Sequence, residues 1–335
     1  EISLGLVGSE MCIRDSMDGV GNRYGVHTVI LEVDGEEVFR SVVDRFAYEE
    51  NRYINSWTHG QYMKSFIEPG NRLRMLHASN GNRGLVEINE ERPYRFVYTL
   101  SDALGNTSKV RFTVQGKNTE IHPVEHREKY AFKWDRTNYL QEPGLELVVP
   151  RGMLYNDVWL DYSVRADSGD VAFTYQLHNK RVPLHGACEM RIGLRRDRLE
   201  DKSKYYVAGV TARGGKYSIG GTYEDGFMKV RIRDLGTYTV AVDTVPPEII
   251  PLNPGQWGRT GRITLKAKDK ETGINSYRGT IDGKYALFGK PNSISGNLVC
   301  ELDPKHVKKG GRHTVEMTVT DGRGNRTTEE FHFVW

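Results

Sequence analysis

The side chains most suggestive of chemistry are His122, Glu125 and His126, which spell the pattern H-x-x-E-H. On a helix the two histidines would lie one turn apart on one face, where they could share a zinc ion with Glu125 as the base. Pro123 and the lack of apolar periodicity instead predict a polar linker. No acidic third ligand follows on a helical segment, so we expect a solvated linker here and no zinc site.

Nucleophilic catalysis has one candidate pair, Cys188 with the nearby His185. Both residues lie in a polar loop pattern without an orienting third group, which a catalytic triad requires. We therefore expect Cys188 to be a small buried side chain. The chain has no G-x-S-x-G, no Walker loop and no G-x-G-x-x-G after a strand, so the sequence does not support nucleotide binding.

Two acidic residues near a predicted domain junction suggest a different kind of site. Asp243 lies in "VDTVPP" and Asp269 in "AKDKETG". Carboxylate oxygens are the ligands that calcium prefers. The pair can share a calcium ion between consecutive β-sandwiches, or can belong to ordinary turns.

The elements that carry these residues are predicted to be strands joined by tight turns. Asp-Gly pairs flanked by β-rich runs indicate type I′ hairpins, because both central residues need positive φ. A second pattern, Asp-x-x-Gly-Asn, separates two further pairs of strands. Both turns occur in the same order near each end of the chain, at Asp34-Gly35 then Asp102–Asn106, and at Asp282-Gly283 then Asp321–Asn325.

This repeat predicts an all-β fold of tandem immunoglobulin-like β-sandwich domains with little helix. The polar stretch "QGKNTEIHPVEHREK" predicts a linker, and Val245-Pro246-Pro247 predicts a second boundary because proline cannot donate to a strand ladder. The predicted domains are an Ig-like sandwich at 17–116, a linker at 117–129, a second sandwich at 130–245 and a C-terminal Ig-like sandwich at 246–335.

The first copy of the repeat has a long insertion between its two turns that is rich in aromatic residues and arginine. Aromatic faces and guanidinium groups can recognise a sugar or a peptide. If the chain has a ligand site, we expect it here, at Arg52, Tyr53, Trp57 and Tyr62. The alternative is that these side chains pack across a sandwich end or against another domain.

Composition limits the possible partners. The chain has 335 residues, of which 47 are Lys or Arg and 44 are Asp or Glu, for a net charge of +3. These charges are dispersed without a basic block, so nucleic acid is not an expected partner. No apolar run reaches the roughly 20 residues that a membrane-spanning helix needs. The three cysteines, Cys12, Cys188 and Cys300, do not suggest a disulfide framework.

The N-terminal stretch "EISLGLVGSEMCIRDS" differs from everything after it. It lacks the positive start and the small-residue cleavage site of a secretory signal. It is similar to a translated sequencing adapter, so we expect residues 1–16 to be an artefact and disordered. The alternative is a genuine first strand.

From Asp18 to Trp335 the chain resembles the C-terminal region of bacterial zinc endopeptidases of the lysostaphin and LytM type, which cut peptidoglycan. The resemblance rests on "VILEVDGEEVFRSVVDRFAYEENRYINS", "SFIEPGNRL", "SDALGNTSKVRFTV", "QLHNKRVPLH", "GGTYEDGFMKVRIRDLGTYTVAVDTVPPEI" and "TGINSYRGTIDGK". The family's zinc motifs, H-x-x-x-D and H-x-H, do not occur in this sequence. No catalytic residue, metal ligand or cofactor therefore carries over.

The resemblance implies a non-catalytic accessory region whose parent is a metalloendopeptidase, with zinc in a peptidase domain upstream. It implies a periplasmic or secreted location in the cell envelope. The expected partners are that peptidase domain, peptidoglycan or an envelope protein. The alternative is a stand-alone envelope adhesin or carbohydrate-binding module, for which tandem sandwiches are the whole protein.

Overall fold

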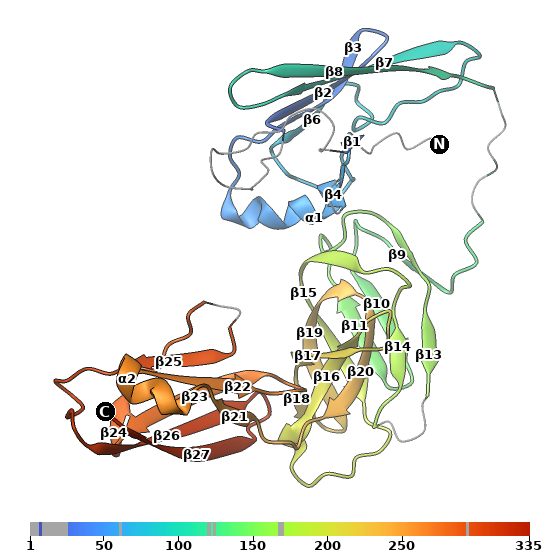
Figure 1. The fold of residues 1–335 in the computed structure, drawn as a ribbon. Coiled ribbons are helices and arrows are strands. Elements are labelled where there is room, and N and C mark those ends of the chain that lie inside the picture. Colours follow the sequence, from blue (N-terminus) through green and yellow to red (C-terminus); the bar gives the residue numbers. More distant parts are fainter. Residues whose placement is uncertain are drawn as a thin grey trace. The chain divides into compact units, whose positions relative to one another are not determined.

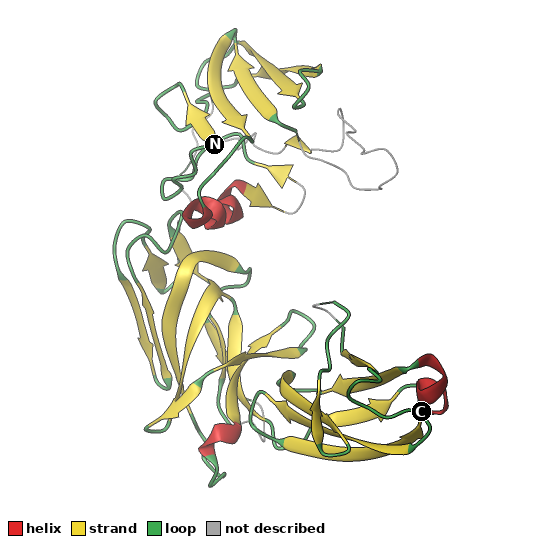
Figure 2. Ribbon diagram, turned by 90° about the vertical axis from the view of Figure 1, so that its left-hand side faces the viewer, coloured by secondary structure: helices red, strands yellow, loops and turns green. Residues whose placement is uncertain are grey.

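A computed structural model describes residues 7–8, 26–59, 62–118, 122, 125–166, 171–292 and 295–335. The chain divides into two compact units. Unit 1 consists of Glu1–Asn138, Val149–Leu160 and Val182–Cys188, and unit 2 consists of Tyr139–Val148, Asp161–Arg181 and Glu189–Trp335. Antiparallel sheets dominate both units, and the described helices are short (Figures 1 and 2). The predicted all-β class is confirmed, whereas the predicted domain boundaries stay predictions.

Unit 1 is built on one five-stranded antiparallel sheet. Its strands, in spatial order, are β6 (Leu76–Ala78), β3 (Glu36–Val42), β2 (Thr28–Val33), β7 (Pro93–Ser101) and β8 (Thr107–Gln115). The shorter elements are β1 (Val7–Gly8), β4 (Thr58–His59), β5 (Tyr62–Met63), β9 (Tyr130–Phe132), β12 (Val158–Leu160), the 3-10 helix η1 (Tyr48–Tyr53) and α1 (Ile54–Trp57).

The alternating strands of this sheet bury one face in a core. In β2 and β7 every second residue is buried, as expected when one side of a sheet is packed and the other is not. The core is completed by residues outside the sheet, including Trp57, Leu73 and Met75. Much of the insertion therefore packs on the five-stranded sheet.

The middle part of the chain forms two five-stranded sheets. The first contains β10 (Asn138–Glu142), β11 (Leu145–Val149), β15 (Val182–Gly193), β19 (Phe227–Leu235) and β18 (Thr222–Glu224). The second contains β13 (Ser163–Arg165), β14 (Thr174–Gln176), β20 (Thr237–Val242), β16 (Tyr205–Val210) and β17 (Lys216–Gly220), and η2 (Lys202–Lys204) precedes β16.

The last part of unit 2 has its own core around Trp257, which is 1% exposed. One sheet has three strands, β21 (Glu248–Pro251), β22 (Arg262–Lys268) and β25 (Asn297–Glu301). The other has four, β24 (Lys284–Ala286), β23 (Ile274–Ile281), β26 (Arg312–Asp321) and β27 (Arg326–Val334). Two short helices, η3 (Pro254–Gln256) and α2 (Trp257–Thr260), precede β22.

The predicted Asp-Gly hairpins are confirmed. Asp34 and Gly35 have φ of 53° and 91°, and Asp282 and Gly283 have φ of 51° and 74°. Positive φ at both central positions is the type I′ geometry, and it joins β2 to β3 and β23 to β24.

The two Asp-x-x-Gly-Asn turns also share one geometry. Asp102 Oδ1 accepts hydrogen bonds from the backbone N–H groups of Leu104 and Asn106, at 2.9 and 2.8 Å. Asp321 Oδ1 accepts from those of Arg323 and Asn325, at 2.7 and 2.9 Å. In each turn the asparagine Nδ2 donates back to the other aspartate oxygen. The internal repeat is therefore a repeat of local hydrogen-bonding chemistry.

Candidate functional site

Three carboxylates converge within unit 2. Asp243 follows β20, Asp269 follows β22, and Asp321 ends β26. Ligand oxygens of the three lie within 4.8 Å of one another. Asp243 and Asp321 are 1% and 0% exposed. Within the described part of the chain, this is the one group of three His, Cys, Asp or Glu side chains close enough to share an ion.

Hydroxyl, amide and backbone N–H groups around the carboxylate cluster donate hydrogen bonds to it. Thr272 Oγ1 donates to Asp243 Oδ2 at 2.5 Å, and Asn325 Nδ2 donates to the Asp243 backbone carbonyl at 3.0 Å. Asp269 Oδ2 accepts from three backbone N–H groups, of which that of Gly273 is the closest at 2.7 Å. These hydrogen bonds hold the Asp243 and Asp269 carboxylates in place.

Burial raises the pKa of Asp243, and the neighbouring charges of Asp269 and Asp321 raise it further. Clustered carboxylates of this kind can bind a hard cation such as Ca²⁺ or share a proton. The sequence pointed to Asp243 and Asp269. It assigned Asp321 to the hairpin turn alone, and the meeting of the three segments is a tertiary feature.

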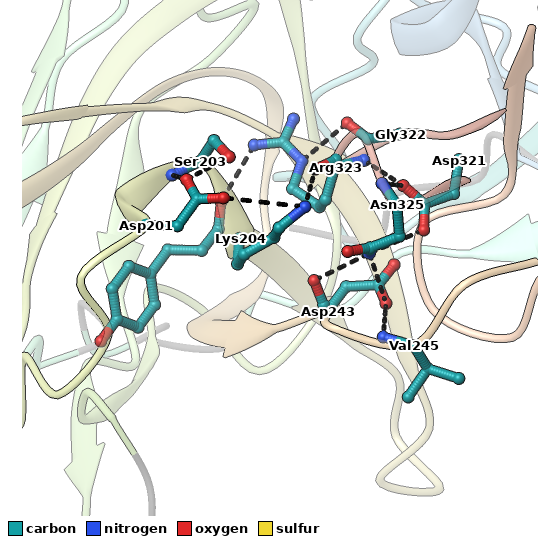
Figure 3. Close-up of polar contacts among 10 residues, drawn as sticks. Asp201, Ser203, Lys204, Asp243, Val245, Asp321, Gly322, Arg323 and Asn325 are labelled. Atoms are coloured by element: carbon teal, nitrogen blue, oxygen red, sulfur yellow. Dashed lines mark hydrogen bonds and ion pairs between the residues drawn. The ribbon is translucent and has the colours of Figure 1, made fainter. Parts of the chain in front are cut away.

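Two cationic side chains beside the carboxylate cluster bind backbone carbonyls (Figure 3). Arg323 Nη1 donates to the carbonyl oxygens of Tyr205 and Gly221, at 2.9 Å each. Lys204 Nζ donates to the carbonyl oxygen of Arg323 at 3.0 Å. The β26–β27 turn is thereby fixed to β16 and to the residue before β18.

The four predicted ligand residues do not form one surface. Trp57 is 4% exposed, and its Nε1 donates to the Lys64 carbonyl oxygen at 3.0 Å. Tyr53 is half-buried, with its ring centroid 4.3 Å from that of His185. Arg52 is half-buried and its backbone carbonyl accepts from a tyrosine hydroxyl at 2.6 Å, whereas Tyr62 is 39% exposed. Whether these residues bind a ligand stays a prediction.

A hollow of about 490 Å³ lies where the two ends of the insertion meet β3 and β6, and we call it the Phe46 hollow. Phe46 is 42% exposed, and Tyr48, two residues on, is 86% exposed. In the sequence, the hollow is indicated only by the same insertion, rich in aromatic residues and arginine, from which residues 52–62 were predicted to bind a ligand. The residues that line the hollow are Val42, Asp44, Arg45, Phe46, Ala47, Arg74, Met75 and His77.

The histidines of the H-x-x-E-H motif and of the Cys188–His185 pair differ in their surroundings. His126 stacks on Trp159, with ring centroids 3.6 Å apart, and His122 is exposed without regular secondary structure. Pro123 and Val124 lie outside the described residues. His185 Nδ1 is 3.3 Å from a tyrosine hydroxyl, and burial, with the charge of Arg52, lowers the pKa of its imidazole.

Cys188 is 1% exposed, which confirms the expectation of a small buried side chain. Among the described residues, no helix has the length and apolar character needed to cross a bilayer.

Comparison with known families gives one match. Residues 129–243, about a third of the chain, match the Zu5-like domain. This segment includes the strands from β9 to β20. No curated protein sequence matches the chain.

Several solved structures show a distant likeness. SGBP-B of the mixed-linkage glucan utilization locus of Bacteroides ovatus, solved with a mixed-linkage heptasaccharide, has 12% identity and a TM-score of 0.16 over 91% of this chain and 59% of its own. A Ca²⁺-stabilized adhesin with which an Antarctic bacterium binds ice has 11% identity and a TM-score of 0.18, over 92% of this chain and 89% of its own.

A 1.5-MDa bacterial ice-binding adhesin has 10% identity and a TM-score of 0.16, over 93% of this chain and 87% of its own. The chain spans less than two thirds of the first of these structures.

Proposed function

We propose that the chain is a non-catalytic binding segment of a cell-envelope protein, of the adhesin or carbohydrate-binding class. The observation that supports it is that the cysteine and histidine side chains named here, which could carry out catalysis, are buried or held in structural contacts. Cys188 and Cys300 are buried, and His126, His185 and His313 contact Trp159, Tyr53 and Asp282. In contrast, Phe46, Tyr48 and neighbouring charged groups are open to solvent.

Tandem β-domains suit this role because their stability lies in strand ladders and cores, which leaves loops and insertions free to recognise a partner. The Zu5-like match adds a recognised domain type to the middle of the chain without indicating a reaction. The expected location is the cell envelope, and the expected partner is a surface polymer or an envelope protein.

Co-sedimentation of the purified chain with insoluble peptidoglycan and with an insoluble neutral polysaccharide tests this proposal. We expect the chain to pellet with at least one polymer and to release no soluble fragments when zinc is added. Release of muropeptides that is lost in His122→Ala or His126→Ala would show catalysis within these residues and overturn the proposal.

A second proposal is that the chain is the accessory region of a zinc endopeptidase of the lysostaphin and LytM type. The segments that resemble this family support it, among them "GGTYEDGFMKVRIRDLGTYTVAVDTVPPEI". Reading the DNA upstream of codon 17 tests it. An open frame with H-x-x-x-D and H-x-H is expected, and a signal peptide joined directly to Met17 would exclude it.

A further inference from the structure

The Phe46 hollow has a fixed frame. Glu50 Oε2 accepts a hydrogen bond from the Ala47 backbone N–H at 2.9 Å, and Glu50 Oε1 accepts from Arg74 Nε at 2.7 Å. The backbone N–H of Val42 donates to the Met75 carbonyl at 2.9 Å. Both walls, 42–47 and 74–77, are therefore tied together before any ligand arrives, which lowers the entropy lost on binding.

The surface chemistry of the hollow combines an apolar ring with polar groups. Phe46 presents a ring without any hydrogen-bonding group, suited to the C–H face of a sugar. Asp44 supplies acceptors, Arg45 supplies donors, and His77 supplies both. Arg74 uses Nε for Glu50, so its Nη groups can donate to hydroxyl oxygens.

The charges in the hollow nearly balance. Asp44 offsets Arg45, and the Glu50 carboxylate, 2.7 Å from Arg74, offsets the second guanidinium. A strongly anionic polymer would gain little from such a site, whereas a neutral ligand rich in hydroxyl groups meets both donors and acceptors. The volume of about 490 Å³ lies within the range of about 300–1,000 Å³ typical of small-molecule sites.

We propose that the Phe46 hollow binds a neutral oligosaccharide, with Phe46 stacked on one sugar ring and Asp44, Arg45 and Arg74 bonded to its hydroxyl groups. This inference rests on the proposed function and specifies both the ligand class and the place. It differs from the sequence-based choice, because Trp57 of that choice lies in the core.

Calorimetric titration of the full chain tests the inference. The neutral probes are cellohexaose, laminarihexaose and chitohexaose, and the acidic probe is polygalacturonate. We expect one neutral probe to bind. Phe46→Ala should weaken it about tenfold, the loss of one ring contact of about 1.4 kcal/mol. Arg45→Ala should weaken the same probe.

Tyr285→Ala is the matched control, because Tyr285 is 64% exposed and lies 5.6 Å from the Arg278 guanidinium in unit 2, which makes it a second exposed aromatic and arginine pair. We expect this variant to bind as the wild type does. Circular dichroism of each variant checks folding, and an exposed Phe46 predicts an unchanged spectrum.

The possible outcomes distinguish failure of the Phe46 hollow as a sugar site from failure of the proposed binding function. Equal affinity of Phe46→Ala and the wild type for a neutral probe overturns the site and leaves the proposed function standing. Binding of polygalacturonate alone overturns the neutral ligand class. A chain that pellets with an insoluble polymer but binds none of the three neutral probes overturns the inference alone. A chain that neither pellets nor binds a probe contradicts both.

Discussion

Arg323, in the turn between β26 and β27, donates a hydrogen bond of 2.9 Å to the backbone carbonyl oxygen of Tyr205, the first residue of β16. The same Nη1 donates to the carbonyl oxygen of Gly221, also at 2.9 Å. Tyr205 lies in the sheet of β16, and Gly221 lies between β17 and β18, so neither acceptor belongs to the sheet of β26 and β27. One guanidinium thus joins three segments that are far apart in the sequence.

Arg323→Ala should destabilise unit 2 by about 2 kcal/mol, because carbonyl groups at a partly buried contact lose a charged donor. Hydrogen exchange of the amides in β16 and β26 measures the loss of protection. Arg326→Ala is the control, since Arg326 is exposed and its Nη2 donates a long hydrogen bond, 3.4 Å, to Thr318 Oγ1. Equal exchange in the two variants would show that the Arg323 contacts contribute nothing to stability.

The paired turns at Asn106 and Asn325 allow a matched comparison. Both asparagines donate to the aspartate four residues earlier, but Asn325 is 8% exposed and also donates to the Asp243 carbonyl at 3.0 Å, whereas Asn106 is exposed. Asn106→Ala should cost about 1 kcal/mol and Asn325→Ala about 2–3 kcal/mol, since the latter also leaves a buried carbonyl without this donor.

Hydrogen exchange in the strands that flank each turn measures these two costs. The relevant amides are those of β7 and β8 for Asn106, and those of β26 and β27 for Asn325. A larger loss of protection at Asn106 than at Asn325 would contradict the idea that burial determines the difference.

The features that could be predicted from the sequence are those whose geometry depends only on residues close together in the chain. Asp34-Gly35 and Asp102–Asn106 were predictable because a turn's φ angles and its side-chain hydrogen bonds are set within five residues. The carboxylate cluster was found in part, because Asp243 and Asp269 stand near a domain junction. Asp321 was not, since its approach depends on how three distant strand ends converge.

The ligand site shows the same limit. An insertion rich in aromatic residues was evident from the sequence, but the pattern did not say which rings enter the core. Trp57 is 4% exposed and Phe46 is 42% exposed, only eleven residues apart. The difference arises because Trp57 ends α1, which packs on the sheet, whereas Phe46 precedes η1 at the rim of a hollow.

Cys300 should be unreactive in the folded chain. Burial, with the nearby charge of Glu301, raises the pKa of its thiol to about 11, so little thiolate exists at pH 8. We expect a thiol reagent at pH 8 to label Cys300 only after unfolding in denaturant, and peptide mass spectrometry identifies the site. Rapid labelling of Cys300 without denaturant would show that β25 opens readily.

Trp57→Ala should destabilise unit 1 by about 3–5 kcal/mol, because it removes a large ring from the core and the hydrogen bond from Nε1 to the Lys64 carbonyl. Tyr62→Ala should change stability by no more than about 0.5 kcal/mol, since Tyr62 is 39% exposed. Exchange protection of β2 and β7 amides measures both. If Trp57→Ala abolished sugar binding while protection stayed at the wild-type level, Trp57 would be a ligand contact, as the sequence suggested, and not a core residue.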